Sequence, residues 1–368
     1  HTRLLQVTGV QTCALPISPI QNENRKKKNT TTTVFGNELH RYSIADGIRD
    51  KNVLGFDPYK VLTFKDKDVR KVVALEKANA KTEEEAISDP AKSKIYYKYM
   101  DAGRVPMAGH FDKKGKYITG IEDYIPKTQY QTEEHTKTVV KDIEENWLTL
   151  SRGSKFHAIF ATRNIREAID YYRLMKSELP HLKITALFDS SIDNNEDARS
   201  KEDGLVEIIE DYNSLYGQDF TIPTFHKMKK DIASRLAHKK PYERIENEPE
   251  KQLDLLIVVD QMLTGFDSKW INTLYLDKVI EYENIIQAFS RTNRLFGPDN
   301  KPFGTIRYYR KPHTMESNIN AAVKLYSGDK PLGLFAWHLI ENLKEINRLF
   351  ENIFDIAPKI GRASCRER

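Results

Sequence analysis

The sequence predicts an α/β protein with a parallel, doubly wound sheet, followed by the start of an α-helical domain. Apolar, β-branched runs alternate with amphipathic helical segments from Thr136 onward, as is typical of parallel sheets covered by helices. One run, Leu253–Val259, has the length and character of a strand buried on both faces. After Tyr309, apolar residues recur at alternating intervals of three and four, which predicts helix packing: Ala336, Leu339, Leu343, Ile346, Phe350 and Ile353.

The amino-terminal third gives weaker structural signals. Ser43 and Asp46 have the spacing of a capping box and predict a short helix that runs to about Asp50. A short strand is expected at Lys60–Phe64. The next segment, residues 65–131, is charged at first and then rich in Gly, Pro, Tyr and Lys without a clear period. We therefore expect it to be an insertion.

From Thr136 the pattern becomes regular. One predicted helix places five apolar residues on a single face: Ile165, Ala168, Ile169, Tyr172 and Met175. The other expected elements are a helix at Thr136–Leu148, strands at Phe156–Ala161 and Lys183–Phe188, an acidic loop at Asn194–Asp203, and helices at Leu205–Leu215 and Phe225–Leu236.

The central block, Asp254–Arg310, carries the candidate chemistry. Its first strand ends in a polar loop, Thr264-Gly265-Phe266-Asp267, and further strands are expected at Ile271–Leu276 and Thr305–Tyr309. Between these two strands, a helix from about Glu281 is expected to carry three polar residues on one face, because they are spaced by four and three: Gln287, Arg291 and Arg294.

These residues suit a phosphate ligand. Ligands of open α/β sheets bind at the carboxyl ends of the strands, and the polar loop is predicted to lie at such an end. Two arginines one turn apart can neutralise the charge of a transferring phosphoryl group. Spacing alone leaves a second interpretation open, in which the arginines pair with surface carboxylates.

The same residues carry a resemblance. The polar loop followed by QAFSRTNR looks like motifs V and VI of a superfamily 2 helicase motor, whose motif VI has the form Q-x-x-G-R-x-G-R. Ser290 and Asn293 replace its two glycines. The stretches LLIVVDQMLTGFDSKWINTLYLDK and IIQAFSRTNRLFGPDNKPFGTIRYYRKPHTME resemble the R (HsdR) subunit of type I restriction endonucleases. The resemblance covers roughly residues 19–360.

This resemblance implies a RecA-like fold and roles for motif VI. Arg291 and Arg294 would be catalytic and would reach the γ-phosphate of ATP as arginine fingers. Gln287 would orient the nucleotide or its attacking water.

Two further motifs supply the remaining candidates. In motif V, Gly265 and Asp267 are candidates for nucleotide binding, although Asp267 could instead link to motif VI, and Thr264 is a candidate for contact with a DNA phosphate. A strand-end turn with a capping Asp is the alternative interpretation. Thr162 and Arg163 match motif IV by position and would bind DNA phosphates. Equally, Thr162 would only cap the helix that follows. For one basic cluster a solvated charged face is favoured over DNA contact: Arg235, His238, Lys239, Lys240 and Tyr242.

Several motifs do not occur in these 368 residues. There is no G-x-x-x-x-G-K-[ST] loop, no DEAD or DExH box, and no Asp…Glu-x-Lys nuclease set. In the family that the sequence resembles, those parts lie upstream, in the nuclease domain and the first motor domain. The chain alone is therefore expected to be an inactive part of an R subunit.

Composition adds little about partners. The chain has a formal charge of +5 and two cysteines, Cys13 and Cys365. Both fall in end segments, residues 1–18 and 361–368, that resemble translated sequencing-adapter sequence and are expected to be non-native. Without these ends, 54 basic residues face 52 acidic ones, so charge does not argue for nucleic-acid binding. No apolar stretch is long enough to span a membrane, and no thiolate metal site is expected.

The resemblance also implies a domain organisation. Residues 19–59 would end the first motor domain and connect it to the second. Residues 60–311 would form the second RecA-like motor domain, with the insertion at about 65–131. Residues 312–360 would start the helical domain.

The complete subunit is expected to be a cytoplasmic enzyme that uses ATP and Mg²⁺ to translocate double-stranded DNA and to cleave it. Its partners would be the modification (M) and specificity (S) subunits, with no membrane involved. Two other hypotheses stay open. One is a non-enzymatic DNA-binding module on a degenerate motor fold. The other is a different superfamily 2 DNA translocase, which Ser290 and Asn293 disfavour.

Overall fold

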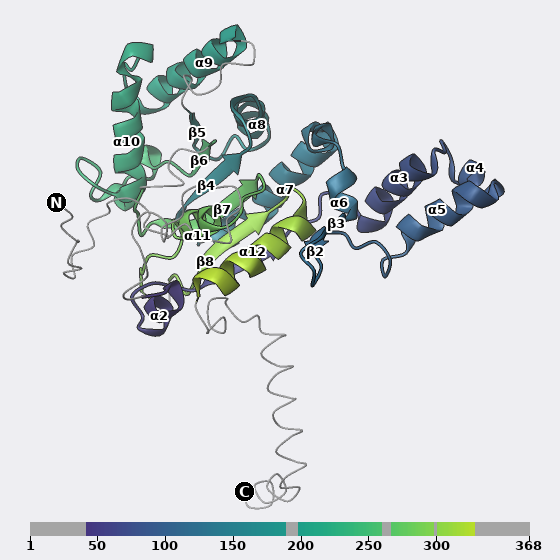
Figure 1. The fold of residues 1–368 in the computed structure, drawn as a ribbon. Coiled ribbons are helices and arrows are strands. Elements are labelled where there is room, and N and C mark those ends of the chain that lie inside the picture. Colours follow the sequence, from purple (N-terminus) through teal and green to yellow (C-terminus); the bar gives the residue numbers. More distant parts are fainter. Residues whose placement is uncertain (1–41, 189–197, 260–265, 298–299, 328–368) are drawn as a thin grey trace, which may run out of the picture. The chain divides into compact units, whose positions relative to one another are not determined.

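A computed structural model of the chain describes residues 42–188, 198–259, 266–297 and 300–327. All of them lie within the first of the chain's two units, His1–Leu334. Six strands form one sheet in the order β1-β8-β7-β4-β6-β5, and every neighbouring pair is parallel (Figure 1). The strands are β1 (Phe56–Lys60), β4 (His157–Thr162), β5 (Ile184–Leu187), β6 (Leu255–Val258), β7 (Ile271–Asp277) and β8 (Gly304–Tyr308).

Helices precede, connect and follow these strands. In chain order they are α2 (Ile44–Arg49), α3 (Asp66–Ala78), α4 (Glu83–Ser88), α5 (Pro90–Met100), α6 (Ile121–Tyr124), α7 (Glu133–Leu150), α8 (Ile165–Glu178), α9 (Ala198–Tyr216), α10 (Phe225–Ala237), α11 (Glu283–Phe289) and α12 (Pro312–Tyr326). None of the described helices combines the length and the apolar character needed to cross a membrane.

Helices cover both faces of the sheet, which confirms the predicted doubly wound fold. On β8, Arg307 donates hydrogen bonds to Asp142 of α7. The next register pair, Lys60 and Tyr308, points to the opposite face because side chains alternate along a strand. There Lys60 pairs with Glu316 of α12 at 2.7 Å. Strands β4, β6 and β7 are buried throughout, as expected for strands between two helical layers.

Local sequence explains the most reliable predictions. Ser43 and Asp46 form the predicted capping box at the start of α2. Asn164 caps α8 by accepting a hydrogen bond from the backbone N–H of Glu167. The five apolar residues predicted to share a face of this helix are all buried: Ile165, Ala168, Ile169, Tyr172 and Met175.

Two predicted elements differ from the structure, one in its position along the chain and one in its type. The first strand is Phe56–Lys60 rather than Lys60–Phe64, and it straddles the predicted domain boundary at residue 60. This strand is at the sheet edge, where Pro58 is tolerated because no neighbour needs its missing N–H. Residues 198–203, expected to continue an acidic loop, begin helix α9. The apolar seam predicted from Ala336 lies outside the described residues.

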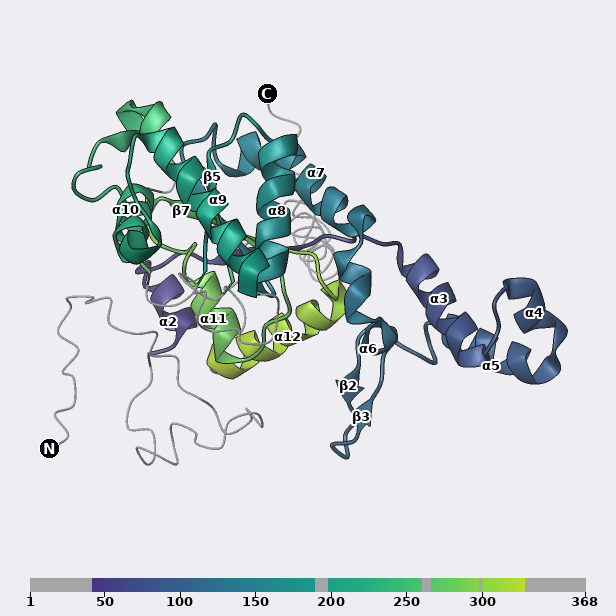
Figure 2. The same ribbon diagram turned by 90° about the horizontal axis from the view of Figure 1, so that it is seen from above.

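The predicted insertion folds around its own small apolar cluster. Helices α3, α4 and α5 lie together, and β2 (His110–Phe111) pairs with β3 (Tyr117–Ile118) in a hairpin beside α6 (Figure 2). Ala74, Ala78, Ala86 and Tyr96 form the cluster. The buried guanidinium of Arg70 donates to the carbonyl of Val105 at 2.7 Å, which ties α3 to the chain that follows α5.

The sheet core should be the main source of stability. Phe160, on β4, is fully buried and packs edge-on against Tyr171 with ring centroids 4.7 Å apart. We expect Phe160→Ala to lower the free energy of unfolding by about 3–5 kcal/mol, because it leaves a cavity in a layer covered on both faces. Urea unfolding would measure this change. Val72→Ala is the control: its side chain is 63% exposed, so its midpoint should hardly move.

Candidate functional site

Helix α11 ends before the two arginines of the candidate site. The expectation that Gln287, Arg291 and Arg294 share one helical face is therefore wrong. Beyond Phe289 the α-helical hydrogen-bond pattern gives way to a tighter turn. The N–H of Arg291 donates to the carbonyl three residues earlier, at 3.1 Å. The hydroxyl of Ser290 donates a hydrogen bond to a backbone carbonyl of the preceding turn. Such side-chain hydrogen bonds compete with the backbone hydrogen bonds of a regular helix.

Both arginines contact the segment that leads into β7. Arg294 Nε donates to Asp267 Oδ1 at 2.5 Å. Arg291 Nη1 donates to the carbonyl of Phe266, and its Nε donates to the carbonyl of Gln287 at 3.1 Å. The turn after α11 is thereby attached to the end of the predicted motif V. Thr264 and Gly265 lie outside the described residues.

This contact lies at the edge where strands begin, not where they end. Asp267 precedes the first residue of β7, Ile271, by only four positions. The carbonyl of Asn293 accepts a hydrogen bond from the N–H of Leu54 at 2.8 Å, just before β1. A Cβ on Gly304, the first residue of β8, would collide with Thr292. The expectation of a carboxyl-edge site is thus wrong for Phe266, Asp267, Arg291 and Arg294, because these residues lie where β7 begins.

The two arginines differ in accessibility. The side chain of Arg294 is 24% exposed and that of Asp267 is 34% exposed. Arg291 is buried, with 7% of its surface exposed. Gln287 is half-buried on α11. Of the two guanidinium groups, that of Arg294 is the one a ligand from solvent can approach.

A buried lysine lies beside this pair. Lys301 is fully buried, and its Nζ donates to the carbonyls of Ile271 at 2.6 Å and of Lys269 at 3.1 Å. Burial lowers the pKa of Lys301 to about 7; the charge of Arg294 acts in the same direction and Asp267 opposes it. Nothing in the sequence spacing marks this residue, yet it fixes the start of β7 next to Asp267.

At the opposite edge, Thr162 does not have either predicted role. It is fully buried at the end of β4, and its hydroxyl donates to the carbonyl of Asn164 at 3.2 Å. The helix cap is the side chain of Asn164 instead. No hydroxyl is therefore available to a DNA phosphate from Thr162 in this structure. Arg163 stays accessible, with its side chain 38% exposed and 4.0 Å from Glu167.

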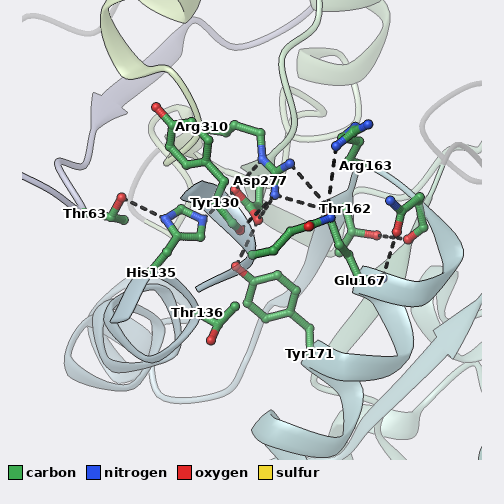
Figure 3. Close-up of polar contacts among 12 residues, drawn as sticks. Thr63, Tyr130, His135, Thr136, Thr162, Arg163, Glu167, Tyr171, Asp277 and Arg310 are labelled. Carbon is green, nitrogen blue, oxygen red and sulfur yellow. Dashed lines mark hydrogen bonds and ion pairs between the residues drawn. The ribbon is translucent and has the colours of Figure 1, made fainter. Parts of the chain in front are cut away.

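A buried ionic network that the sequence did not reveal closes this carboxyl edge (Figure 3). Asp277, the last residue of β7, accepts from Arg310 Nη2 at 2.9 Å and from the Tyr171 hydroxyl at 2.9 Å. Arg310 also pairs with Glu167 of α8 at 3.0 Å. His135 Nε2 lies 3.0 Å from the second oxygen of Asp277. Four elements therefore meet at one carboxylate.

The network also holds both ends of the insertion. His135 Nδ1 lies 2.8 Å from the hydroxyl of Thr63, at one end. At the other end, the carbonyl of Tyr130 accepts from Arg310 at 3.3 Å. Both ring nitrogens of His135 therefore have a hydrogen-bond partner. The two ends of the insertion therefore lie close together, at this network.

Asp277 is ionised in this setting. Burial alone would raise its pKa, but the hydrogen bond from His135 and the positive charges of His135 and Arg310 outweigh burial, and the pKa is lowered. Burial raises the pKa of Tyr171 well above its usual range, so this phenol remains a donor. The signal that sequence could have offered is a lone Asp at the end of a buried strand.

The basic cluster around residue 238 is structural in part. Arg235 is buried, donates to Asp231 at 2.9 Å and lies over the ring of Tyr216. His238 stacks on Trp270 with centroids 3.7 Å apart. The prediction of a solvated face is therefore wrong for these two residues, whose long-range partners the local sequence did not indicate.

Within the described ranges, no group of three or more His, Cys, Asp or Glu side chains could hold a metal ion. Arg294 presents a partly exposed cation beside a carboxylate that orients it, an arrangement that suits contact with a phosphate. By its described residues, this is an α/β protein with a cationic site at one sheet edge and a closed ionic network at the other.

Sequence comparisons show which known proteins this chain resembles. Residues 154–311 match the family described as "Type I restriction enzyme subunit R domain 3". A type I restriction enzyme endonuclease subunit from Staphylococcus aureus strain COL is 32% identical over 308 residues, which are 81% of this chain and 27% of that protein. A similar subunit from Staphylococcus saprophyticus is 29% identical over 320 residues, 84% of this chain and 28% of that protein. These matches confirm the resemblance: the chain is a relative of type I restriction enzyme R (endonuclease) subunits.

The chain spans only about a quarter of these relatives, 27% of the S. aureus subunit. A solved fragment assigned to the HsdR subunit of a type I restriction enzyme from Vibrio vulnificus YJ016 is also similar. It has a TM-score of 0.40 and 13% identity, and the match covers 87% of this chain and 41% of that one.

The ionic network should set the acid stability of the fold. We expect Asp277→Asn to lower the free energy of unfolding at pH 7 by about 3–5 kcal/mol, because Arg310 loses one of its two buried counter-charges and keeps only Glu167. A carboxyl pKa lowered by folding stabilises the protein above its unfolded value, about pH 4, and this contribution is lost as the pH falls through the folded pKa. The variant should therefore lose less stability than the wild type on acidification.

Denaturant melts between pH 2.5 and 7, about the range in which carboxyl groups titrate, would measure both effects. Glu145→Gln is the matched control, since that side chain is 61% exposed and 3.7 Å from Lys141. Equal stability of Asp277→Asn and wild type at pH 7 would show that this carboxylate does not hold the edge together.

Proposed function

We propose that this chain supplies the second motor domain of a type I restriction enzyme R subunit. In the complete subunit, ATP hydrolysis would drive translocation of double-stranded DNA, and translocation would lead to cleavage. The similarity to endonuclease subunits and the match of residues 154–311 to domain 3 support this assignment. In this proposal the M and S subunits are the protein partners.

The position of Arg294 is the observation that carries the proposal. Its guanidinium is partly exposed and is held by Asp267 at the edge where the strands begin. The chain contains no phosphate-binding G-x-x-x-x-G-K-[ST] loop of its own. A cation presented in this way suits a nucleotide cradled by another domain, where it would stabilise the charge on the transferring phosphoryl group. ATP and Mg²⁺ would then be held mainly by the first motor domain.

Asp267 and Arg291 would prepare Arg294 for this role. The Asp267 carboxylate keeps the guanidinium pointing out of the fold before the nucleotide arrives. Arg291 fixes the turn that carries Arg294 through its bond to the carbonyl of Phe266. Pre-ordering removes part of the entropy cost of aligning a long side chain with its ligand. Gln287, on the helix just before the turn, would face the same ligand.

We assign DNA to the opposite edge of the sheet. Arg163 is accessible there, after β4. Thr264 of motif V, which lies outside the described residues, would be a second DNA contact. Lys278 also lies at the same edge as Arg163 and donates to the carbonyl of Val259 at 2.9 Å. Cations at this edge would bind phosphates without reading sequence.

The decisive variant is Arg294→Ala in the complete subunit that contains this chain. We expect DNA-stimulated ATP turnover to fall about 10³-fold or more, because a finger arginine acts on charge that develops in the transition state. Arg173→Ala is the matched control: this arginine is 49% exposed and pairs with Glu207 on the surface, so turnover should stay near wild type. Steady-state ATPase assays with and without duplex DNA provide the measurement.

Full turnover by Arg294→Ala would exclude this residue as the finger. The isolated chain should hydrolyse no ATP, and turnover by it would contradict the division of the site between two domains. A complete subunit that binds DNA but never hydrolyses ATP would favour the non-enzymatic DNA-binding module instead.

A further inference from the structure

The hairpin within the insertion carries a group of lysines on a well-ordered turn. Its strands, β2 and β3, are joined by residues 112–116, of sequence Asp-Lys-Lys-Gly-Lys. Asp112 Oδ1 accepts from the backbone N–H groups of Lys114 at 2.8 Å and of Lys116 at 2.9 Å. Gly115 adopts φ +77°, which a side chain would disfavour. The carboxylate therefore shapes the turn, and the exposed lysines, Lys113 included, surround it.

Aromatic side chains are exposed on the same hairpin. Phe111 is 57% exposed and Tyr117 is 43% exposed, and their rings meet edge-on with centroids 5.1 Å apart. Ile118 is 38% exposed. Apolar rings beside cations are a costly surface for a protein that meets only water, but they suit a nucleic acid, which offers both phosphates and stacking faces.

The base of the hairpin is fixed to the fold. A Cβ on Gly120 would come within 2.4 Å of the backbone N of Gly109, so the two sides of the hairpin approach too closely for a larger residue. The Tyr117 hydroxyl donates to Asp123 of α6 at 2.9 Å. Buried Glu122 accepts from the backbone N–H groups of His313 and Thr314, at the start of α12. The hairpin is therefore held through α6.

The hairpin lies toward the carboxyl edge of the sheet. Glu122 of α6, at the base of the hairpin, accepts hydrogen bonds from the first turn of α12. That helix begins at Pro312, four residues after β8 ends at Tyr308. This is the edge assigned above to DNA, so the lysine turn and Arg163 belong to the same side of the sheet.

We propose that the hairpin, residues 110–118, is a DNA-binding element in which Lys113, Lys114 and Lys116 contact phosphates and Phe111 stacks on an unpaired base. The inference rests on the proposed function, because DNA is the partner it assigns. Charge favours this occupant: the turn carries three lysines against one aspartate. A protein partner would more often bury a surface depleted of lysine.

The phosphate contacts are tested by their salt dependence. The variant Lys113→Gln/Lys114→Gln/Lys116→Gln of the full chain is titrated against a fluorescent DNA duplex at several salt concentrations. Each lost phosphate contact lowers the slope of log Kd against log salt by about 0.9, so the slope should fall by about 2–3. The matched control is Lys227→Gln/Lys229→Gln/Lys230→Gln on α10, where three lysines are also exposed. An unchanged slope, or an equal change in the control, would overturn the assignment to the hairpin.

The stacking contact is tested with Phe111→Ala on single-stranded and duplex DNA. Loss of one stacked base should weaken single-strand binding by about fivefold or more and leave duplex binding nearly unchanged. Phe111→Trp should restore single-strand binding, because it supplies a larger aromatic face. If Phe111→Ala binds single strands as the wild type does, the hairpin does not stack on bases.

The outcomes separate this inference from the proposed function. If wild-type chain binds DNA and the hairpin variants bind equally well, only the hairpin assignment fails. If wild-type chain binds no DNA at all, DNA as the partner of this domain fails together with it. If the lysine variant binds DNA normally but no longer associates with the M and S subunits, the hairpin is a protein-docking element and the DNA assignment is overturned.

Discussion

The buried pairing of Arg310 with Asp277 is the interaction on which the organisation of the domain depends. Removing a charge from water costs several kcal/mol, so such a pair persists only where hydrogen bonds satisfy the remaining donors and acceptors. Here Glu167 and the carbonyl of Tyr130 take further donors of Arg310, while His135 and Tyr171 donate to Asp277. Replacing any single partner would leave a buried group unsatisfied. The carboxyl edge is consequently closed around a fixed point rather than left as an open crevice.

Strand β7 connects this fixed point to the opposite edge. At its start, Lys301 holds the carbonyl of Ile271; at its end, His135 and Arg310 hold Asp277. A strand tied at both ends and buried along its whole length is a stiff element. In the proposed motor, nucleotide chemistry at one edge and DNA at the other would be joined by such stiff elements. A demonstrated coupling between the two edges, rather than their shared strand, would be the physical proof.

The sequence predicted the sheet well because its strands are buried on both faces and thus continuously apolar. It also predicted α2 and α8, whose starts carry local capping residues. It failed where tertiary contacts decide. Arg235 sits in a locally basic stretch, yet Tyr212 and Asp231 bury it. That Asp267 and Arg294 meet where β7 begins cannot be inferred from the residue types of the motif. Asp277 and Arg310 are 33 positions apart, and no local pattern links them.

The motif spacing predicts the same role for Arg291 and Arg294, but the two side chains have different surroundings. Arg291 is buried, and its guanidinium donates to the carbonyl of Phe266. Moving the guanidinium to a ligand would leave this carbonyl without that hydrogen bond and would disturb the turn. Arg294 pairs with a carboxylate that is itself one-third exposed, 34%, and ion pairs of this kind contribute little net stability. Exchanging Asp267 for a phosphate oxygen is therefore inexpensive for Arg294 alone. The arginine that holds the turn is therefore the buried Arg291, and the more exposed Arg294 is the residue that the proposed function assigns as the finger.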